Sequence, residues 1–248
     1  MCLFAVDGTW SPDFNNQNLG TGAGGRAVGN RAEAVRSNTR RFYEESSFPA
    51  SKKFYFVGPA AGATGSDAYP IYFNVLRTIE REVNSGNCTE IVMVGWSRGA
   101  AIISELTEGL SSLNATNTRL DPRMTRRGTR MQELANVIKK GKLPPIKFVG
   151  LFDSVAMIAR AAPHDQRWGE EITPDVKYFA HVIAGDRTGP LGGLIDFREA
   201  DPLVQADRRA ILHIGHATHS GVGGQDDSAE ARRAYEFIRN HATIAGVN

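Results

Sequence analysis

Cysteine is scarce in this chain of 248 residues, which contains only Cys2 and Cys88. Two cysteines are too few for a disulfide framework and lack the spacing of metal ligands, so we expect a reducing compartment and no metal. No stretch approaches the roughly 20 apolar residues that a membrane span needs. The amino terminus has no basic segment and reaches Asp7 early, so no cleaved signal peptide is expected. These absences predict a cytoplasmic protein, or one exported without such a signal.

The chain also lacks a strong excess of charge of either sign, with a formal net charge of +2. This balance argues against nucleic acid as an obligatory partner. Hydrophobic residues make up 41% and charged residues 23%, which is ordinary for a globular protein. No internal repeat and no linker rich in proline or serine divides the chain. We therefore expect a single α/β domain over residues 1–248.

Apolar runs alternate with amphipathic segments along the chain. The expected strands are 2–6, 53–57, 91–94, 146–152, 176–183 and 210–214. The expected helices are 31–45, 71–83, 100–112, 131–140 and 229–241, with a long loop over 11–30. Strands separated by helical segments predict a mostly parallel central sheet with helices on both faces.

Residues 95–99, with the sequence G-W-S-R-G, form a G-x-S-x-G pentapeptide between an apolar strand and a helical segment. This context is typical of a nucleophile elbow, in which a tight turn holds the serine hydroxyl at the carboxyl end of the sheet. The flanking glycines relieve collisions with the neighbouring backbone. The alternative is a glycine-rich turn with an incidental serine. The pattern makes Ser97 the candidate nucleophile.

A serine becomes nucleophilic when a histidine, oriented by a carboxylate, takes its proton. Asp153 and His219 follow later strands, and carboxyl ends of parallel strands meet at one edge of the sheet. The alternatives are that Asp153 caps a helix beginning at Ser154 and that His219 is a solvated loop residue. His213, His216 and His219 also have a regular spacing, but strand positions three apart face opposite sides, which disfavours a metal.

The oxyanion of an acyl-transfer reaction needs backbone N–H donors. The residue after the nucleophile, Arg98, is expected to supply one, and Gly8 or Thr9 at the end of the first strand the other. We expect Asp7, Trp10 and Trp96, which flank these donors and the serine, to contact the substrate. The alternative is that residues 7–9 form only a tight turn.

Five segments in order resemble an α/β-hydrolase family catalogued as a domain of unknown function, which includes the type VI secretion phospholipase effectors. The segments are D-G-T-W at 7–10, N-T at 38–39, G-W-S-R-G-A at 95–100, G-L-F-D-S-V at 150–155 and H-S-G-V-G-G at 219–224. The chain has Gly221 and Ser154 where the family usually has an acid and a threonine. The resemblance implies an α/β-hydrolase-like fold, a Ser97–Asp153–His219 triad and a lipid-like ester as substrate. It also favours His219 over His216.

The sequence thus predicts a serine hydrolase of carboxylic esters, of the esterase or phospholipase kind, that uses no cofactor. A small-molecule ester or lipid is the expected partner, with transient contact to a membrane surface. An acyltransferase on the same triad, or a binding protein that keeps the fold, are the alternatives. Five arginines between Arg119 and Arg130 form either a lid-like insertion that meets anionic head groups or a solvated polar loop.

Overall fold

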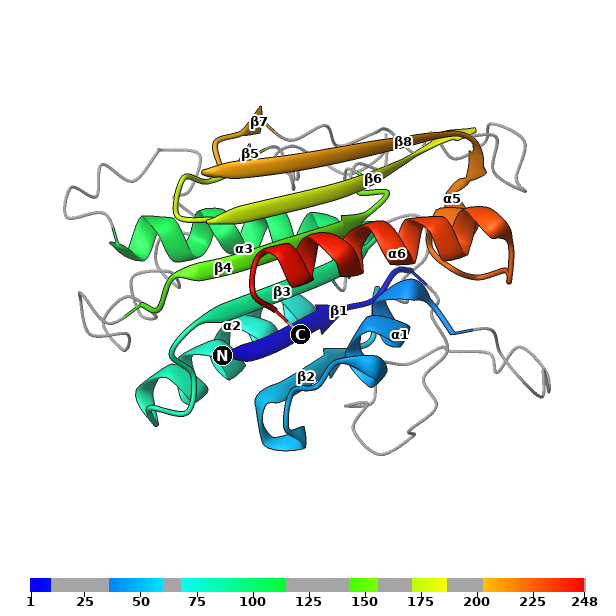
Figure 1. The fold of residues 1–248 in the computed structure, drawn as a ribbon. Helices are drawn as coiled ribbons and strands as arrows, with labels where there is room; N and C mark the ends of the chain where they lie inside the picture. The colour runs from blue at the N-terminus through cyan, green and yellow to red at the C-terminus, as the bar shows by residue number, and fades with distance from the viewer. Residues whose placement is uncertain (10–35, 60–67, 115–142, 156–170, 187–202, 248) are drawn as a thin grey trace.

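Six parallel strands form the central sheet of the computed structural model, which describes residues 1–9, 36–59, 68–114, 143–155, 171–186 and 203–247 (Figure 1). The strands lie in the order β2-β1-β3-β4-β6-β8, and each neighbouring pair is parallel. Their bounds are β1 Cys2–Val6, β2 Lys53–Phe56, β3 Ile91–Trp96, β4 Ile146–Phe152, β6 Tyr178–Asp186 and β8 Arg208–Thr218. A separate two-stranded sheet pairs β5 (Glu171–Ile172) with β7 (Leu203–Val204).

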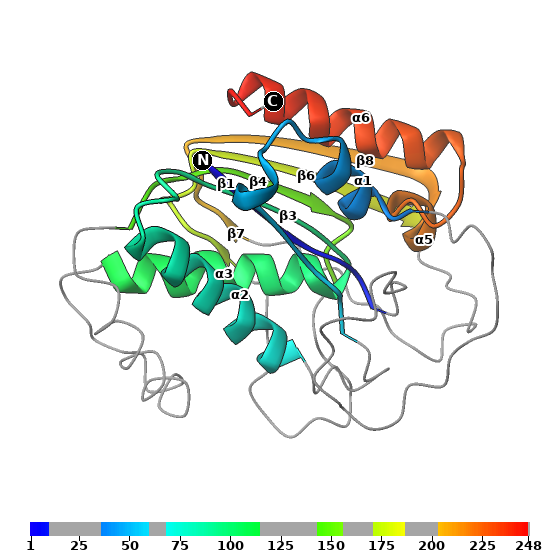
Figure 2. The ribbon, with the colours of Figure 1, turned by 90° about the horizontal axis from the view of Figure 1, so that it is seen from below.

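Helices cover both faces of the sheet (Figure 2). One layer contains α2 (Ala68–Asn84) and α3 (Arg98–Asn114), and the other contains α1 (Asn38–Glu45) and α6 (Ala229–Ile244). A 3₁₀ turn at Ala50–Lys52 precedes β2, and the short helix α5 (His219–Val222) joins β8 to α6. The expected α/β fold with a parallel sheet between helices is therefore confirmed.

The core lies on both sides of β1 and β3, whose residues are all buried. Phe4 and Met93 point toward α2 and α3, whereas Ala5 and Val94 belong to the apolar cluster beneath α6. A strand covered on both faces needs apolar residues at every position. This requirement explains why β1 and β3 appear in the sequence as continuous apolar runs without alternation.

Several boundaries differ from the sequence-based expectation. Helix α1 begins at Asn38 because Ser37 caps it, accepting the N–H of Arg40 on its side chain. Strand β8 extends well beyond 210–214 at both ends. His219, expected in a loop, is the first residue of α5. The predicted helix at 131–140, the loop at 11–30, Trp10 and the arginines from Arg119 to Arg130 lie outside the described residues. Within the described residues, no helix is long and apolar enough to span a membrane.

Candidate active site

Ser97 occupies the single position between the end of β3 and the start of α3, with a backbone φ of 57°. A left-handed conformation at a residue with a Cβ costs about 1–3 kcal/mol and persists only where neighbours impose it. Here the Ser97 N–H donates to the carbonyl of Phe152 at 3.0 Å, and the Ser97 carbonyl accepts the N–H of Ala100 at 3.1 Å. The strand-turn-helix context expected of a nucleophile elbow is present.

Both glycines of the pentapeptide stand where a side chain would collide with backbone. A Cβ at Gly95 would lie 2.8 Å from the Cα of Ala100, because the first turn of α3 folds back over the end of β3. A Cβ at Gly99 would lie 2.3 Å from the carbonyl oxygen of Asp7, because that turn also rests on the end of β1. The turn therefore requires glycine at both positions for steric reasons.

The three side chains predicted to converge are hydrogen-bonded in series. His219 Nε2 lies 2.8 Å from Ser97 Oγ, and His219 Nδ1 lies 2.6 Å from Asp153 Oδ2. A carboxylate can only accept, so Nδ1 carries the proton and Nε2 is free to accept the serine hydroxyl proton. Asp153 and Ser97 are buried, and the imidazole is 14% exposed. This arrangement has the geometry required for general-base activation of an alcohol.

Asp153 follows β4 and is fixed by the neighbouring strand β6. Its N–H donates to the carbonyl of Val182 at 2.7 Å, and its Oδ1 accepts the N–H of Ala184 at 2.9 Å. Its backbone φ is 41°, a second left-handed residue at this edge. The carboxylate thus binds both β6 and His219. The two residues that follow Asp153 are not helical, which disfavours the alternative of a helix cap.

His219 is held by a capped helix turn and by α1. Thr218 accepts the N–H of Gly221 on its hydroxyl at 3.0 Å, which caps α5. Asn38 at the start of α1 donates from Nδ2 to the carbonyls of Val222 and Ala231, both at 2.9 Å. These bonds join α1, α5 and α6, and they fix the segment that carries the imidazole. No local signal in the sequence predicts this role of Asn38, although the N-T pair belongs to the family resemblance.

The predicted oxyanion donors lie at the ends of β1 and β3. Arg98 is the first residue of α3 and directly follows Ser97. The Gly8 N–H donates to Asp7 Oδ1 at 2.8 Å. Thr9 follows, and its hydroxyl is buried with no hydrogen-bond partner within the described residues. Gly8 and Thr9 are the two residues expected to supply the second oxyanion donor. The N–H of Gly8 already donates to the Asp7 carboxylate.

Asp7 and Trp96, two of the residues expected to contact the substrate, are buried and packed against other parts of the protein. Asp7 is 1% exposed, and its Oδ2 accepts the hydroxyls of Ser37, at 2.5 Å, and Tyr55. Burial, with the negative charge of Asp7 beside it, raises the pKa of the Tyr55 phenol well above its ordinary value. Trp96 is 3% exposed and packs in the core cluster under α6. The sequence does not predict the contacts of Ser37 and Tyr55, because nothing local links either residue to Asp7.

The other two histidines of the 213–219 segment do not join the site. His213 and His216 are exposed on β8, the edge strand, whereas His219 turns inward to Asp153. Across the described ranges, no group of three or more histidine, cysteine or acidic side chains is placed to hold a metal ion. His213 and His216 belong to β8, whereas His219 belongs to α5.

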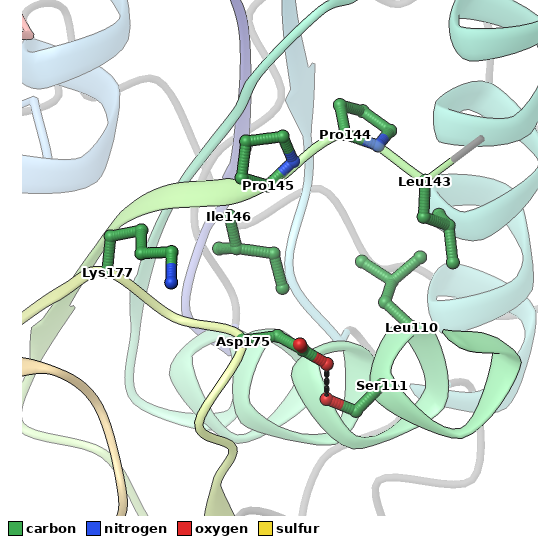
Figure 3. A pocket seen from close by; sticks show the side chains of 8 residues that line it. All are labelled: Leu110, Ser111, Leu143, Pro144, Pro145, Ile146, Asp175 and Lys177. Atoms are coloured by element: carbon green, nitrogen blue, oxygen red, sulfur yellow. Dashed lines mark hydrogen bonds between the residues drawn. The ribbon is translucent and has the colours of Figure 1, made fainter. Parts of the chain in front are cut away.

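A cavity of about 210 Å³, seen from close by in Figure 3, lies at the start of β4. Ile146, the first residue of β4, lines it together with Leu110 and Lys177, and Ser111 donates a hydrogen bond to Asp175 at its edge. Ser97 and Asp153 stand at the carboxyl ends of their strands, seven residues of β4 away from this cavity. The cavity therefore does not belong to the candidate active site.

No family model and no curated protein sequence matches the chain. Among solved structures, an uncharacterized protein from Pseudomonas aeruginosa is similar, with 15% identity and a TM-score of 0.53. The match covers 99% of this chain and 46% of that one. The Tle1 effector bound to the VgrG spike of the type 6 secretion system matches with a TM-score of 0.46 and 15% identity, over 76% and 40% of the two chains. The chain thus spans less than half the length of either protein, and the first likeness shows the fold alone.

Proposed function

We propose that the protein is a serine hydrolase that cleaves carboxylic esters through an acyl-enzyme. The observation that carries the proposal is the series of two hydrogen bonds, 2.8 and 2.6 Å long, that joins Ser97 to His219 and His219 to Asp153. The strained φ of Ser97 adds support, because strain of this kind concentrates at reactive positions. The family resemblance favours lipid-like acyl chains as the substrate class.

In the proposed reaction, Ser97 Oγ attacks the ester carbonyl carbon while its proton moves to His219 Nε2. Asp153 stabilises the imidazolium that forms. Backbone N–H groups of Arg98 and of the segment after β1 receive the oxyanion of the tetrahedral intermediate. The intermediate collapses as His219 returns the proton to the leaving alcohol. Water then repeats these steps on the acyl-enzyme and releases the acid.

The proposal is tested with a fluorophosphonate probe and with p-nitrophenyl esters and phospholipids of graded chain length. The probe should label the peptide that contains Ser97, and Ser97→Ala should abolish labelling and lower kcat by on the order of 10⁶-fold. Ser104→Ala is the matched control, because Ser104 is a buried serine of α3, the helix that follows Ser97, and its hydroxyl donates to the carbonyl of Ala100 in the same helix. Its labelling should equal that of the wild type.

Absence of labelling at Ser97 together with absence of turnover on every ester would overturn the proposal in favour of a binding protein. Turnover that survives in Ser97→Ala would assign the reaction to another residue. Products formed on added alcohols or thiols, in place of the free acid, would identify an acyltransferase.

A further inference from the structure

The buried carboxylate of Asp7 ties together three segments that are distant in sequence. Ser37 precedes α1 and Tyr55 belongs to β2, and their hydroxyls both donate to Oδ2. The N–H of Gly8 donates to Oδ1 at 2.8 Å. A carboxylate that is 1% exposed is costly to bury unless such donors compensate for the lost water. The contacts therefore fix both the carboxylate and the backbone that follows it.

The backbone of Asp7 lies directly beside the turn that carries Ser97. Strand β1 pairs with β3 in a register that sets Val6 opposite Gly95, so the residues after β1 run alongside the elbow. A Cβ at Gly99 would contact the Asp7 carbonyl at 2.3 Å, and a Cβ at Gly8 would contact the Trp96 ring at 2.4 Å. The Asp7–Gly8 backbone is thus packed against the turn on both sides of Ser97.

The bond from Gly8 to Asp7 decides between the two donors expected at this position. A donor already engaged by a carboxylate is poorly suited to receive a developing oxyanion, whereas a preorganised one stabilises it strongly. Thr9 is the next residue, and its hydroxyl is buried without a hydrogen-bond partner in the described part of the chain. The hydroxyl of Thr39 shares this property, so the choice of Thr9 rests on its place directly after the Asp7–Gly8 backbone that packs against the turn at Ser97.

We propose that Asp7 is a positioning residue that holds the Gly8 N–H and presents the N–H and hydroxyl of Thr9 to the substrate oxyanion. The inference rests on the proposed hydrolase function and replaces the expected contact between Asp7 and the substrate. Asp7 acts through Thr9, so it alters stabilisation of the transition state and leaves ground-state binding of the ester unchanged.

The test compares kcat, KM and the inhibition constant of a trifluoromethyl ketone, which forms an anionic hemiketal with an active-site serine. Asp7→Asn and Thr9→Val should lower kcat by about 10- to 1,000-fold, the range for lost oxyanion donors, with little change in KM. The inhibition constant should weaken by the same factor as kcat/KM. Thr9→Ser should restore most of the activity because it keeps the hydroxyl.

Thr39→Val is the matched control, because Thr39 is also fully buried with a hydroxyl that lacks a partner among the described residues. It should leave kcat and the inhibition constant near the wild-type values. If Asp7→Asn fails to fold, Tyr55→Phe and Ser37→Ala serve instead, since each removes one donor and keeps the carboxylate. Ser37→Ala also removes the cap of α1, so Tyr55→Phe is the cleaner variant. Both should shift kcat/KM and the inhibition constant in proportion.

A rise in KM at constant kcat in Asp7→Asn would show that Asp7 contributes to binding of the substrate in its ground state, and it would overturn the inference. Wild-type ketone affinity in Thr9→Val, or in folded Asp7→Asn, Tyr55→Phe and Ser37→Ala, would overturn it as well. These results are separate from a failure of the proposed function, in which the wild-type protein itself neither turns over esters nor reacts with the fluorophosphonate.

Discussion

The indole of Trp96 lies against the imidazole of His219, with ring centroids 5.5 Å apart and planes inclined by 31°. The indole is enclosed between two glycines, because a Cβ at Gly8 would come within 2.4 Å of it and a Cβ at Gly223 within 2.0 Å. Trp96, the residue before the proposed nucleophile, therefore supports the proposed base from one side. Its size fits the space that Gly8, after β1, and Gly223, after α5, leave open.

Replacing Trp96 with Phe should lower both stability and turnover. The smaller ring leaves a void, which costs about 1–3 kcal/mol in the free energy of unfolding. It also removes part of the surface that holds the imidazole, so kcat should fall by about tenfold while KM changes little. Thermal unfolding and steady-state kinetics measure the two effects. An unchanged kcat in the folded variant would limit Trp96 to packing.

His219→Ala should eliminate turnover, whereas His216→Ala and His213→Ala should be tolerated. Only His219 contacts Ser97 and Asp153, and the other two side chains are exposed on β8. Loss of a general base of this kind lowers kcat by on the order of 10⁶-fold. Kinetics on one p-nitrophenyl ester compare all three variants. Equal losses in His216→Ala and His219→Ala would contradict the choice of base.

Gly99→Ala should destabilise the fold, and Gly215→Ala should not. The added methyl at position 99 meets the carbonyl oxygens of Asp7 and Val6, at 2.3 and 2.4 Å, and forced overpacking costs about 1–3 kcal/mol. At position 215 nothing lies within 4 Å of the added atom, so the free energy of unfolding should stay constant or rise by about 0.5 kcal/mol. Denaturant titration distinguishes the variants, and similar values for both would disprove the steric account of the elbow.

Both cysteine thiols should resist modification in the folded protein. Burial raises the pKa of Cys2 and of Cys88, and a thiol reagent needs the thiolate. The unfolded thiols ionise first, so the free energy of unfolding should decline as the pH rises above the ordinary thiol value of 9.0. A disulfide reagent at mildly alkaline pH, with and without denaturant, measures the protection. Rapid reaction in the native state would show that the thiols are accessible.

The sequence predicts the buried strands best, because burial on both faces of the sheet requires apolar residues along their whole length. Strand β4 has the predicted bounds, since an apolar run lies between Pro145 and Asp153. Strand β8 is longer than predicted, because an edge strand tolerates exposed residues such as Arg209 and His216, which break the apolar run. Helix α2 begins three residues earlier than expected, with Pro70 in its first turn, where proline is compatible with a helix.

The candidate site also has residues that the sequence predicts and contacts that it does not. Ser97, Asp153 and His219 could be nominated because each follows a predicted strand and the parallel sheet brings such positions to one edge. The environment of Asp7 could not be predicted, because its partners Ser37 and Tyr55 lie 30 and 48 positions away and depend on side-chain packing. The burial of Trp96 has the same origin, since only the folded backbone creates the space that the indole fills.

The left-handed backbones of Ser97 and Asp153, with φ angles of 57° and 41°, place a cost in stability at two residues that the proposed reaction needs. Each costs about 1–3 kcal/mol, against a total stability of about 5–15 kcal/mol for a typical domain. Glycine at both positions would remove this cost, but it would also remove the Ser97 hydroxyl and the Asp153 carboxylate. Substitutions meant to stabilise this protein should therefore be placed on its outer helices, away from the carboxyl edge of the sheet.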